Sequence, residues 1–295
     1  MADIAEKKIH TALKDNEFFE TLKPDEMLHV LITDIILNED VKKANFESWM
    51  NIKDRWPEIG MPERMDQVLR VLEVEKPSVT LQAFQKVGFM HFCLPLCFPI
   101  KKLWDKKCFY AIIDNFDKIN TDDLLFRLNV LMFPFVPEAT RQTFIEADLD
   151  DEAVEWMSST IERYMEFIRL NNVSKLKNFI FTYGKDFYFY INDYADAIRR
   201  ITDFKEYNRP ESLSVVNSWI RGGVPLEIAD LAVNADDIKE AGSENDEETE
   251  ALLNYLMEKV LKKPEYNDKD TLISLIKRLK QKQIDRMVTK LPKNR

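Results

Sequence analysis

Apolar side chains recur at helical spacing along most of the chain. A clear example is the set Met65, Val68, Leu69 and Leu72, which follows the i, i+3, i+4, i+7 rule behind Pro62. Proline is favoured in the first turn of a helix, because the N–H that it lacks would have no helical partner there. The pattern therefore predicts an amphipathic helix that begins close to Pro62.

The same spacing recurs in three later segments. Prolines stop the first two stripes, as they stop helices, and lysines and arginines occupy the opposite face of the third. Gly88 follows a further apolar segment, at the position that a helix C-cap takes. These patterns predict apolar helix faces at 124–132, 252–261 and 272–287 and the end of another helix at 82–87.

One segment also fits a strand pattern. Phe179, Phe181 and Tyr183 alternate with other residues before Gly184, and aromatic residues resume at Phe187, which would suit a β-hairpin. We expect helix here, because no other clear strands exist to complete a sheet and an isolated hairpin is marginally stable. The chain has only 6 glycines among 295 residues, which also favours helices joined by short connections. The predicted fold class is all-α.

The net charge of −10 disfavours a general nucleic-acid-binding surface, but the charge is unevenly distributed. Residues 234–250 contain eight acids and one lysine, whereas residues 261–295 contain eleven lysines and arginines against four acids. A basic C-terminal end on an acidic body is compatible with a local RNA contact. No apolar run reaches the roughly 18 residues of a membrane span, and no signal peptide is recognisable. We expect a cytoplasmic protein without a membrane segment.

The chain offers few residues for catalysis or metal binding. His91 stands near Cys93 and Cys97, but no second ligand pair follows, and structural zinc requires four converging ligands. Cys108 has no histidine near it in the sequence, which disfavours a catalytic thiol. Three cysteines, an odd number without C-x-x-C spacing, are expected to be reduced, buried thiols. The sequence contains neither a phosphate-binding glycine loop nor a nucleophile elbow. We therefore expect no catalytic residue, metal or cofactor.

Acidic residues are frequent where helices are predicted to begin. Two-metal catalysis needs carboxylates that converge beside a substrate pocket, whereas a helix N-terminus favours acids through capping and through the helix dipole. Capping is the preferred interpretation. The clusters are Asp122–Asp123, Asp148 with 150–152, and Asp236–Asp237.

Several stretches, taken in order, resemble the class II (bacterial-type) family of CCA-adding tRNA nucleotidyltransferases and their poly(A) polymerase relatives. The first stretches are similar to the family's neck, the central ones to its body and the last two to its tail. In the tail, the family's pattern N-x-D-L…G, then L-L-x-x-V-L-x-x-P-x-x-N-x-K, is approximated by N-A-D-D-I-K-E-A-G and L-L-N-Y-L-M-E-K-V-L-K-K-P-E-Y-N-D-K. The stretches are 5–19, 24–36, 63–72, 77–95, 122–133, 231–242 and 251–277.

The resemblance implies neck-like helices at 1–75, a helical body at 76–206 and a C-terminal tail module at 207–295. It also implies tRNA as the partner. The resemblance starts at the neck, so the family's head, with its D-x-D magnesium ligands, has no counterpart. We therefore expect no nucleotide addition by this chain alone, and a split enzyme would need a separate nucleotidyltransferase head as its partner.

The positions that resemble the family's nucleotide-recognition motifs are degenerate. Where the family has E-D-x-x-R, this chain has Asp25, Glu26 and, in place of the arginine, His29, which cannot supply the guanidinium fork that reads a base. Glu63 and Arg64 match the next motif, but its second glutamate is missing. The H-D phosphohydrolase pair of some family members is missing as well.

Basic residues near the C-terminus are candidate RNA contacts, because lysine and arginine attract phosphate. The family has a glycine-rich turn close to tRNA, but the matching segment here, 243–250, is acidic and would repel phosphate. A solvated helix face remains the alternative interpretation of the basic residues. The candidates are Arg221, Lys277, Arg278, Lys280, Lys282 and Arg286.

The sequence therefore predicts a non-catalytic tRNA-binding protein, either a pseudoenzyme or the body subunit of a split nucleotidyltransferase. His29 favours the pseudoenzyme, because a split enzyme would still need its base-reading residues. The alternative is a helical protein-interaction scaffold that has lost RNA binding, which the acidic segment 234–250 favours. An enzyme of another kind would need a site made from scattered acids, and no spacing supports one.

Overall fold

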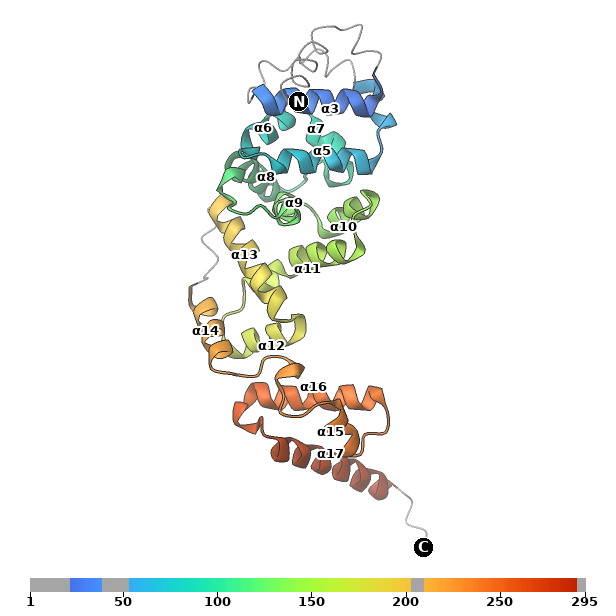
Figure 1. The fold of residues 1–295 in the computed structure, drawn as a ribbon, viewed down its shortest axis with the longest axis vertical. Coiled ribbons are helices and arrows are strands. Elements are labelled where there is room, and N and C mark those ends of the chain that lie inside the picture. The colour runs from blue at the N-terminus through green and yellow to red at the C-terminus, as the bar shows by residue number, and fades with distance from the viewer. Residues whose placement is uncertain (1–21, 39–52, 203–209, 291–295) are drawn as a thin grey trace, which may run out of the picture. The chain divides into compact units, whose positions relative to one another are not determined.

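The computed structural model describes residues 22–38, 53–202 and 210–290, and within these ranges every regular element is a helix (Figure 1). The predicted all-α fold is confirmed. None of the described helices is long and apolar enough to cross a membrane. The first stretch of the family resemblance, 5–19, lies outside the described residues, as does the start of the expected tail at 207–209.

The chain packs as two compact units. The first takes in the residues up to Met165 together with Tyr194–Tyr207, and the second takes in Glu166–Asp193 together with the residues from Asn208 onward. Each unit is therefore made of two separate segments of the chain. The neck, body and tail ranges expected from the family resemblance stay a prediction.

The first unit is built around helix α5 (Met61–Glu73). It has Pro62 in its first turn and buries Met65, Val68 and Leu72, as the apolar pattern predicts. Helices α3, α6, α7, α9 and α10 all pack against it. The other elements that begin in this unit are α3 (Pro24–Asn38), η1 (Lys53–Glu58), α6 (Pro77–Val87), α7 (Phe89–Cys93), η2 (Pro95–Cys97), α8 (Leu103–Asn115), η3 (Phe116–Lys118), α9 (Leu124–Met132), α10 (Pro137–Glu146) and α11 (Asp151–Phe167).

Two arginines hold the ends of α5. Arg64, in its first turn, donates hydrogen bonds to the carbonyls of Ile59 (2.9 Å) and Phe92 (3.1 Å), and its guanidinium lies 4.1 Å from the centre of the Phe92 ring. Arg127 of α9 donates to the carbonyl of Leu72, in the last turn of α5. A cation is favourable there, because the last carbonyls of a helix lack helical partners. The position of α5 is therefore fixed at both ends.

Helices α6 and α8 pair in opposite directions. The carboxylate of Asp117, just after α8, holds Ser78 at the start of α6, and Gln82 donates to Asp114 at 3.2 Å further along. Gly88 follows α6 in the left-handed conformation, with φ at 78°, so the predicted C-cap is confirmed. The pairing sets the end of α6 beside the middle of α8.

The aromatic segment around Gly184, whose sequence fits either a helix or a β-hairpin, is helical. α12 (Val173–Tyr183) ends at Gly184, whose φ of 87° favours glycine, and α13 begins at the next residue, Lys185. Phe179 and Phe187 are buried. The expectation of helix rather than hairpin is confirmed, because the aromatic rings fill a core between helices.

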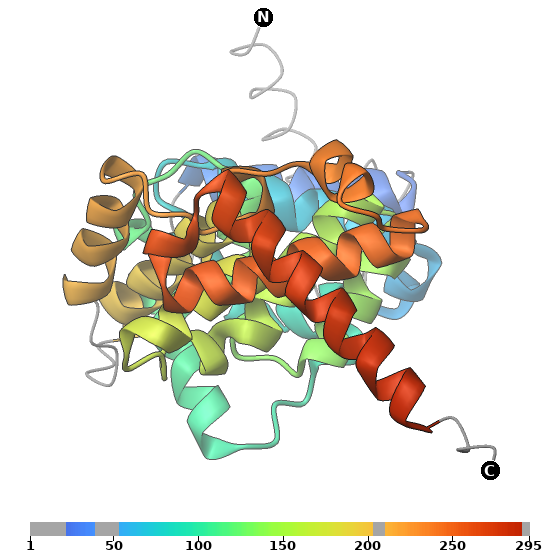
Figure 2. The same cartoon turned by 90° about the horizontal axis from the view of Figure 1, so that it is seen from below.

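The second unit has a separate core around α16. Leu256 and Val260 of α16 and Leu272 and Ile276 of α17 are buried in it, and Figure 2 shows α17 crossing α16 obliquely. The two apolar stripes predicted for this region are confirmed for the residues whose side chains the structure describes. The elements here, besides α12, are α13 (Lys185–Thr202), which ends in the first unit, and α14 (Pro210–Arg221), η4 (Ile228–Asp230), α15 (Ala235–Glu240), α16 (Asp246–Lys262), η5 (Pro264–Tyr266) and α17 (Lys269–Lys290).

Acidic residues cap helices, as interpreted from the sequence. Asp123 accepts a hydrogen bond from a backbone N–H in the first turn of α9 at 3.0 Å, and Asp150 does the same at α11 at 3.0 Å. Asp237 forms a capping box with Asn234 at the start of α15. These carboxylates stabilise helix ends.

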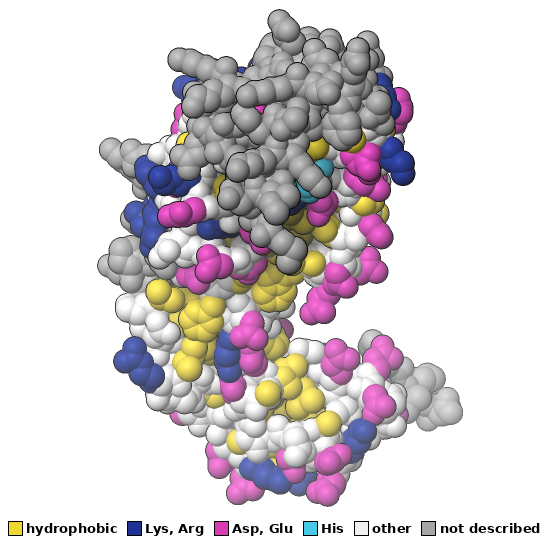
Figure 3. Space-filling model, turned by 45° about the horizontal axis from the view of Figure 1, so that its top comes forward, with side chains coloured by type: hydrophobic (Ala, Val, Ile, Leu, Met, Phe, Trp, Pro, Cys, Tyr) yellow, Lys and Arg dark blue, Asp and Glu magenta, His cyan; other side chains and the backbone are white. Residues whose placement is uncertain are grey.

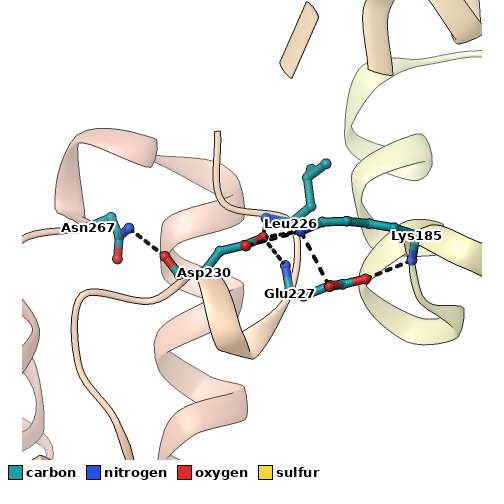
Figure 4. A network of polar contacts seen from close by, with 5 residues as sticks. All are labelled: Lys185, Leu226, Glu227, Asp230 and Asn267. Carbon is teal, nitrogen blue, oxygen red and sulfur yellow. Dashed lines mark hydrogen bonds and ion pairs between the residues drawn. The ribbon is translucent and has the colours of Figure 1, made fainter. Parts of the chain in front are cut away.

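A polar network joins the start of α13 to the loop before α15 (Figure 4). Lys185 Nζ donates to the carboxylate of Asp230 at 2.8 Å and pairs with Glu227 at 3.3 Å. The Asp230 carboxylate also accepts from the backbone N–H groups of Leu226 (2.9 Å) and Glu227 (3.0 Å). Asn267 donates to the carbonyl of Asp230 at 2.9 Å. The network fixes this loop against two helical elements of the same unit.

The network changes the pKa of both charged partners. Burial raises the pKa of Asp230, but the hydrogen bonds from Lys185 and from two backbone N–H groups outweigh burial and leave the pKa below its ordinary value. Burial lowers the pKa of Lys185, but the two carboxylates bring it above its ordinary value. A carboxyl with a depressed pKa stabilises the fold above its unfolded pKa, and this contribution is lost as the pH falls through the folded pKa.

Replacing Asp230 by asparagine tests this network. Asp230→Asn is expected to lower the free energy of unfolding at neutral pH by about 1 to 2 kcal/mol, because charge-assisted hydrogen bonds are lost at a partly exposed site. Urea denaturation measures the effect. The difference from the wild type should shrink in strong acid, where the wild-type carboxyl is protonated. The control Glu250→Gln, at an exposed position of α16, should have little effect. An equal loss of unfolding free energy at neutral pH and in strong acid would show that the charge of Asp230 does not stabilise the fold.

Candidate functional site

A pocket of about 620 Å³ opens between α3 and α5 in the first unit. Pockets for small ligands commonly measure about 300 to 1,000 Å³, so this one could hold a small molecule or a side chain of a partner. Its wall combines apolar side chains with four carboxylates. The lining residues are Leu22, Asp25, Glu26, Leu28, His29, Val30, Pro62, Glu63, Asp66 and Gln67.

Helical spacing explains how these residues meet. Asp25 and His29 lie four residues apart on α3, and Glu63, Asp66 and Gln67 occupy one face of α5. Because α3 packs against α5, the two polar faces border the same space. Four of the five positions at which the sequence resembles the family's nucleotide-recognition motifs therefore line one pocket.

The fifth position, Arg64, does not line the pocket. Its guanidinium is partly buried and is held by hydrogen bonds to the carbonyls of Ile59 and Phe92 and by contact with the Phe92 ring. Burial lowers the pKa of Arg64. Arg64 therefore anchors the first turn of α5 to the chain around Phe92.

A different arginine, Arg70, reaches His29. Its Nη1 lies 2.9 Å from His29 Nδ1 and donates to Gln67 Oε1 at 2.6 Å, while its Nη2 donates to Thr33 Oγ1 at 3.0 Å. A guanidinium can only donate, so Nδ1 of His29 accepts, and the neutral ring carries its proton on Nε2. The guanidinium of Arg70 thus lies beside position 29, where the family pattern has an arginine. The hydrogen bonds of Arg70 join α3 to α5.

The surroundings of His29 favour its neutral form. Burial lowers the pKa of the imidazole, the positive charge of Arg70 lowers it further, and the negative charge of Asp66 opposes both. The pKa of His29 is therefore below its ordinary value of 6.5. A neutral imidazole is compatible with the guanidinium beside it.

The pocket is suited to a cation. Among the described residues, Asp25, Glu26, Glu63 and Asp66 line it with carboxylates, and the guanidinium of Arg70 contacts His29. Glu26 also accepts a hydrogen bond from the backbone at the start of α3, so part of its role is structural. Opposite charges attract in a partly enclosed site, whereas phosphate would be repelled. A lysine or arginine of a partner could place its apolar stem on the pocket wall and its charge among the carboxylates.

The His91–Cys97 segment is partly buried: Cys93, Leu94 and Cys97 lie in the core, whereas His91, Pro95 and Leu96 are exposed. The ring of His91 lies 4.0 Å from that of Phe98, and all three cysteines of the chain are buried free thiols, as expected. Burial raises the pKa of Cys97 to about 11. Among the described residues, no group of three or more histidine, cysteine, aspartate or glutamate side chains is arranged to hold a metal ion.

The candidate RNA contacts on α17 differ in their surroundings. Lys277 and Arg278 are exposed. Lys280 pairs with Glu248 of α16 at 3.2 Å and donates to the carbonyl of Gly242. Lys280 therefore holds α17 against the turn before α16, whereas Lys277 and Arg278 face solvent.

The remaining candidates are less informative. Arg221 is exposed at the last residue of α14, on a helix separate from the other candidates. The side chains of Lys282 and Arg286 lie outside the described residues, although α17 runs through both positions.

Acids and lysines of the second unit pair with each other. Lys239 lies 2.8 Å from Asp246, and Lys269 lies 2.5 Å from Asp237. On the face that Figure 3 shows, lysines and arginines form small separate groups among acidic side chains. Any phosphate contact on this face would therefore be local.

The sequence interpretation missed Asp66, Gln67 and Arg70. A signal was present, because Glu63, Asp66, Gln67 and Arg70 follow the same i, i+3, i+4, i+7 rule as the apolar stripe of this helix. A polar stripe of this kind is usually a solvated face. Only the packing of α3 against it makes the stripe one wall of a pocket.

Comparison with protein-family models, with curated proteins and with solved structures finds no match to this chain.

The pKa of His29 tests the geometry of the pocket. Arg70→Gln should raise the pKa of His29, because a neighbouring positive charge is removed, and Asp66→Asn should lower it, because the opposing negative charge is removed. NMR titration can follow the three histidines of the chain. His91, on α7, serves as the internal control and should keep its pKa in both variants. Shifts of the same sign in both variants would contradict this arrangement.

Proposed function

We propose that this chain is a non-catalytic tRNA-binding protein related to the class II CCA-adding family. The observation that carries the proposal is the meeting of Asp25, Glu26 and His29 with Glu63 at one pocket. Two stretches that are distant in the sequence, and that both resemble the family's neck, border the same space. This agreement supports descent from a nucleotide-handling neck.

The surroundings of the pocket support the absence of catalysis. Arg64 anchors α5 and Arg70 joins α5 to α3, so both guanidinium groups are engaged within the protein. The carboxylates at the pocket attract a cation and repel free phosphate. We infer that the chain adds no nucleotides by itself. A pseudoenzyme fits better than a split enzyme, because the latter would still need a base-reading group.

Exposed cations support contact with RNA phosphate. Lys277 and Arg278 are adjacent on α17 and exposed. Such contacts fix a nucleic acid in place without reading its sequence, so selectivity for tRNA would have to come from its shape.

The second candidate function is a protein-interaction scaffold, and the acidic pocket favours it. Its carboxylates and apolar wall fit a lysine or arginine side chain of a partner protein. A partner that is retained by the wild type and released by Glu63→Lys with Asp66→Lys would establish this function.

A gel-shift assay with tRNA over a salt series tests the first candidate. The logarithm of the binding constant should fall with the logarithm of salt concentration, with a slope of about −0.9 per phosphate contact. Lys277→Glu with Arg278→Glu should weaken binding and make the slope shallower by about 1.8, because two contacts are lost. The control Arg169→Glu with Lys175→Glu makes the same change of charge at exposed positions of the same unit. It should leave the slope unchanged.

Two results would overturn the proposal. Undetectable or salt-insensitive binding of tRNA would exclude RNA binding through phosphate contacts. Extension of a tRNA 3′ end by the purified chain, with CTP, ATP and magnesium, would exclude a non-catalytic role.

A further inference from the structure

Helix α8 exposes two large aromatic side chains. Trp104 is 54% exposed and Tyr110 is 52% exposed. Aromatic rings carry large apolar surfaces that are usually buried, and α8 presents two rings with about half of their surface exposed. They lie six residues apart, which corresponds to about 9 Å along the helix axis.

Lysines surround the two rings. Lys101 and Lys102 precede the helix, and Lys106 and Lys107 lie between the rings in the sequence. All four are exposed, and none forms a salt bridge with another described residue. They differ from the paired lysines of the second unit, because their charges are not neutralised by neighbouring acids.

The lysines of this surface outnumber the acids of α8. Asp105 is half-buried and, at 100° of rotation per residue, lies about 160° around the helix from Lys107. Asp114 follows on the same side of the helix as Lys107 and Tyr110, and it accepts a hydrogen bond from Gln82. The pairing of α6 with α8 brings the exposed Lys86 close to the middle of α8, which adds a further positive charge.

The start of α8 adds backbone donors. Its N-cap residue, Lys102, forms no side-chain cap, so the first N–H groups of the helix receive no hydrogen bond from a capping side chain. Such N–H groups bind phosphate well, and the helix dipole strengthens the attraction. This end therefore combines donors and lysine charges.

We propose that this α8 surface, consisting of Lys101, Lys102, Trp104, Lys106, Lys107 and Tyr110, binds unpaired nucleotides of RNA. The lysines and the helix start contact phosphates, and the two rings stack on bases. The inference rests on the proposed RNA-binding function and assigns the contact to a surface outside both the pocket and α17.

Charge and ring chemistry together favour single-stranded RNA over the alternatives. Duplex RNA offers phosphates but keeps its bases stacked inside, so it would leave the rings unused. Single strands offer phosphates and open base faces together. An anionic membrane would also attract the lysines, but membrane-surface helices bury a broad apolar face. On α8 the exposed face instead carries Lys106, Lys107 and Asp114 beside Tyr110.

Fluorescence anisotropy with a short labelled oligouridine tests the proposal on the full chain. Trp104→Ala and Tyr110→Ala should each weaken binding by about fivefold to about a hundredfold, the value of one stacked base, without changing the salt slope. Lys106→Glu with Lys107→Glu should make the slope shallower by about 1.4, because two phosphate contacts to a single strand are lost. Trp104→Phe keeps a ring and should restore most of the binding. Circular dichroism checks that each variant is folded.

Two further probes separate the outcomes. The oligouridine should bind more tightly than the same length of RNA duplex, and the control Arg169→Glu with Lys175→Glu, at exposed positions outside both proposed RNA contacts, should leave oligouridine binding unchanged. If tRNA binds but the α8 variants have no effect on either RNA, the α8 assignment fails and the proposed function stands. If neither RNA binds, both fail. Binding to phosphatidylserine vesicles without binding to oligouridine would overturn the α8 proposal in favour of a membrane surface.

Discussion

The position of α5 is the constraint on which the candidate pocket depends. Arg64 holds its first turn to the chain around Phe92, and Arg127 holds its last turn through the carbonyl of Leu72. Enclosing a guanidinium carries a desolvation cost, which hydrogen bonds to carbonyls and contact with an aromatic ring offset. Because both ends are fixed, the polar face of α5 has one orientation, and that face forms a wall of the pocket.

The pocket is negative because the arginines near it bind other groups of the protein. Two guanidinium groups lie close to positions where the family pattern has base-reading residues, but Arg64 binds backbone carbonyls and Arg70 binds side chains of α3 and α5. The carboxylates of the same helices remain at the pocket. The described lining of the pocket is negative and repels phosphate, so the proposed contacts with RNA are assigned to other surfaces.

The sequence predicted the helices well because their signals are local. Apolar spacing, a proline in the first turn of α5, and Gly88 at the end of α6 all act within a few residues. The meeting of Asp25 and His29 with Glu63 was not predicted, since it depends on how α3 packs against α5. Arg70 could not be assigned from spacing alone. An exposed arginine and one that joins two helices have the same pattern in the sequence.

The net charge of −10 does not prevent RNA binding, because charges act over short distances. At physiological salt the screening length is about 8 Å, so a phosphate responds mainly to the charges beside it. In the second unit many lysines already have acidic partners, and their attraction for phosphate is reduced. The lysines around Trp104 and Tyr110 have no ion-pair partner among the described residues. A few unpaired charges beside exposed rings are therefore a better contact for RNA than a larger number of neutralised ones.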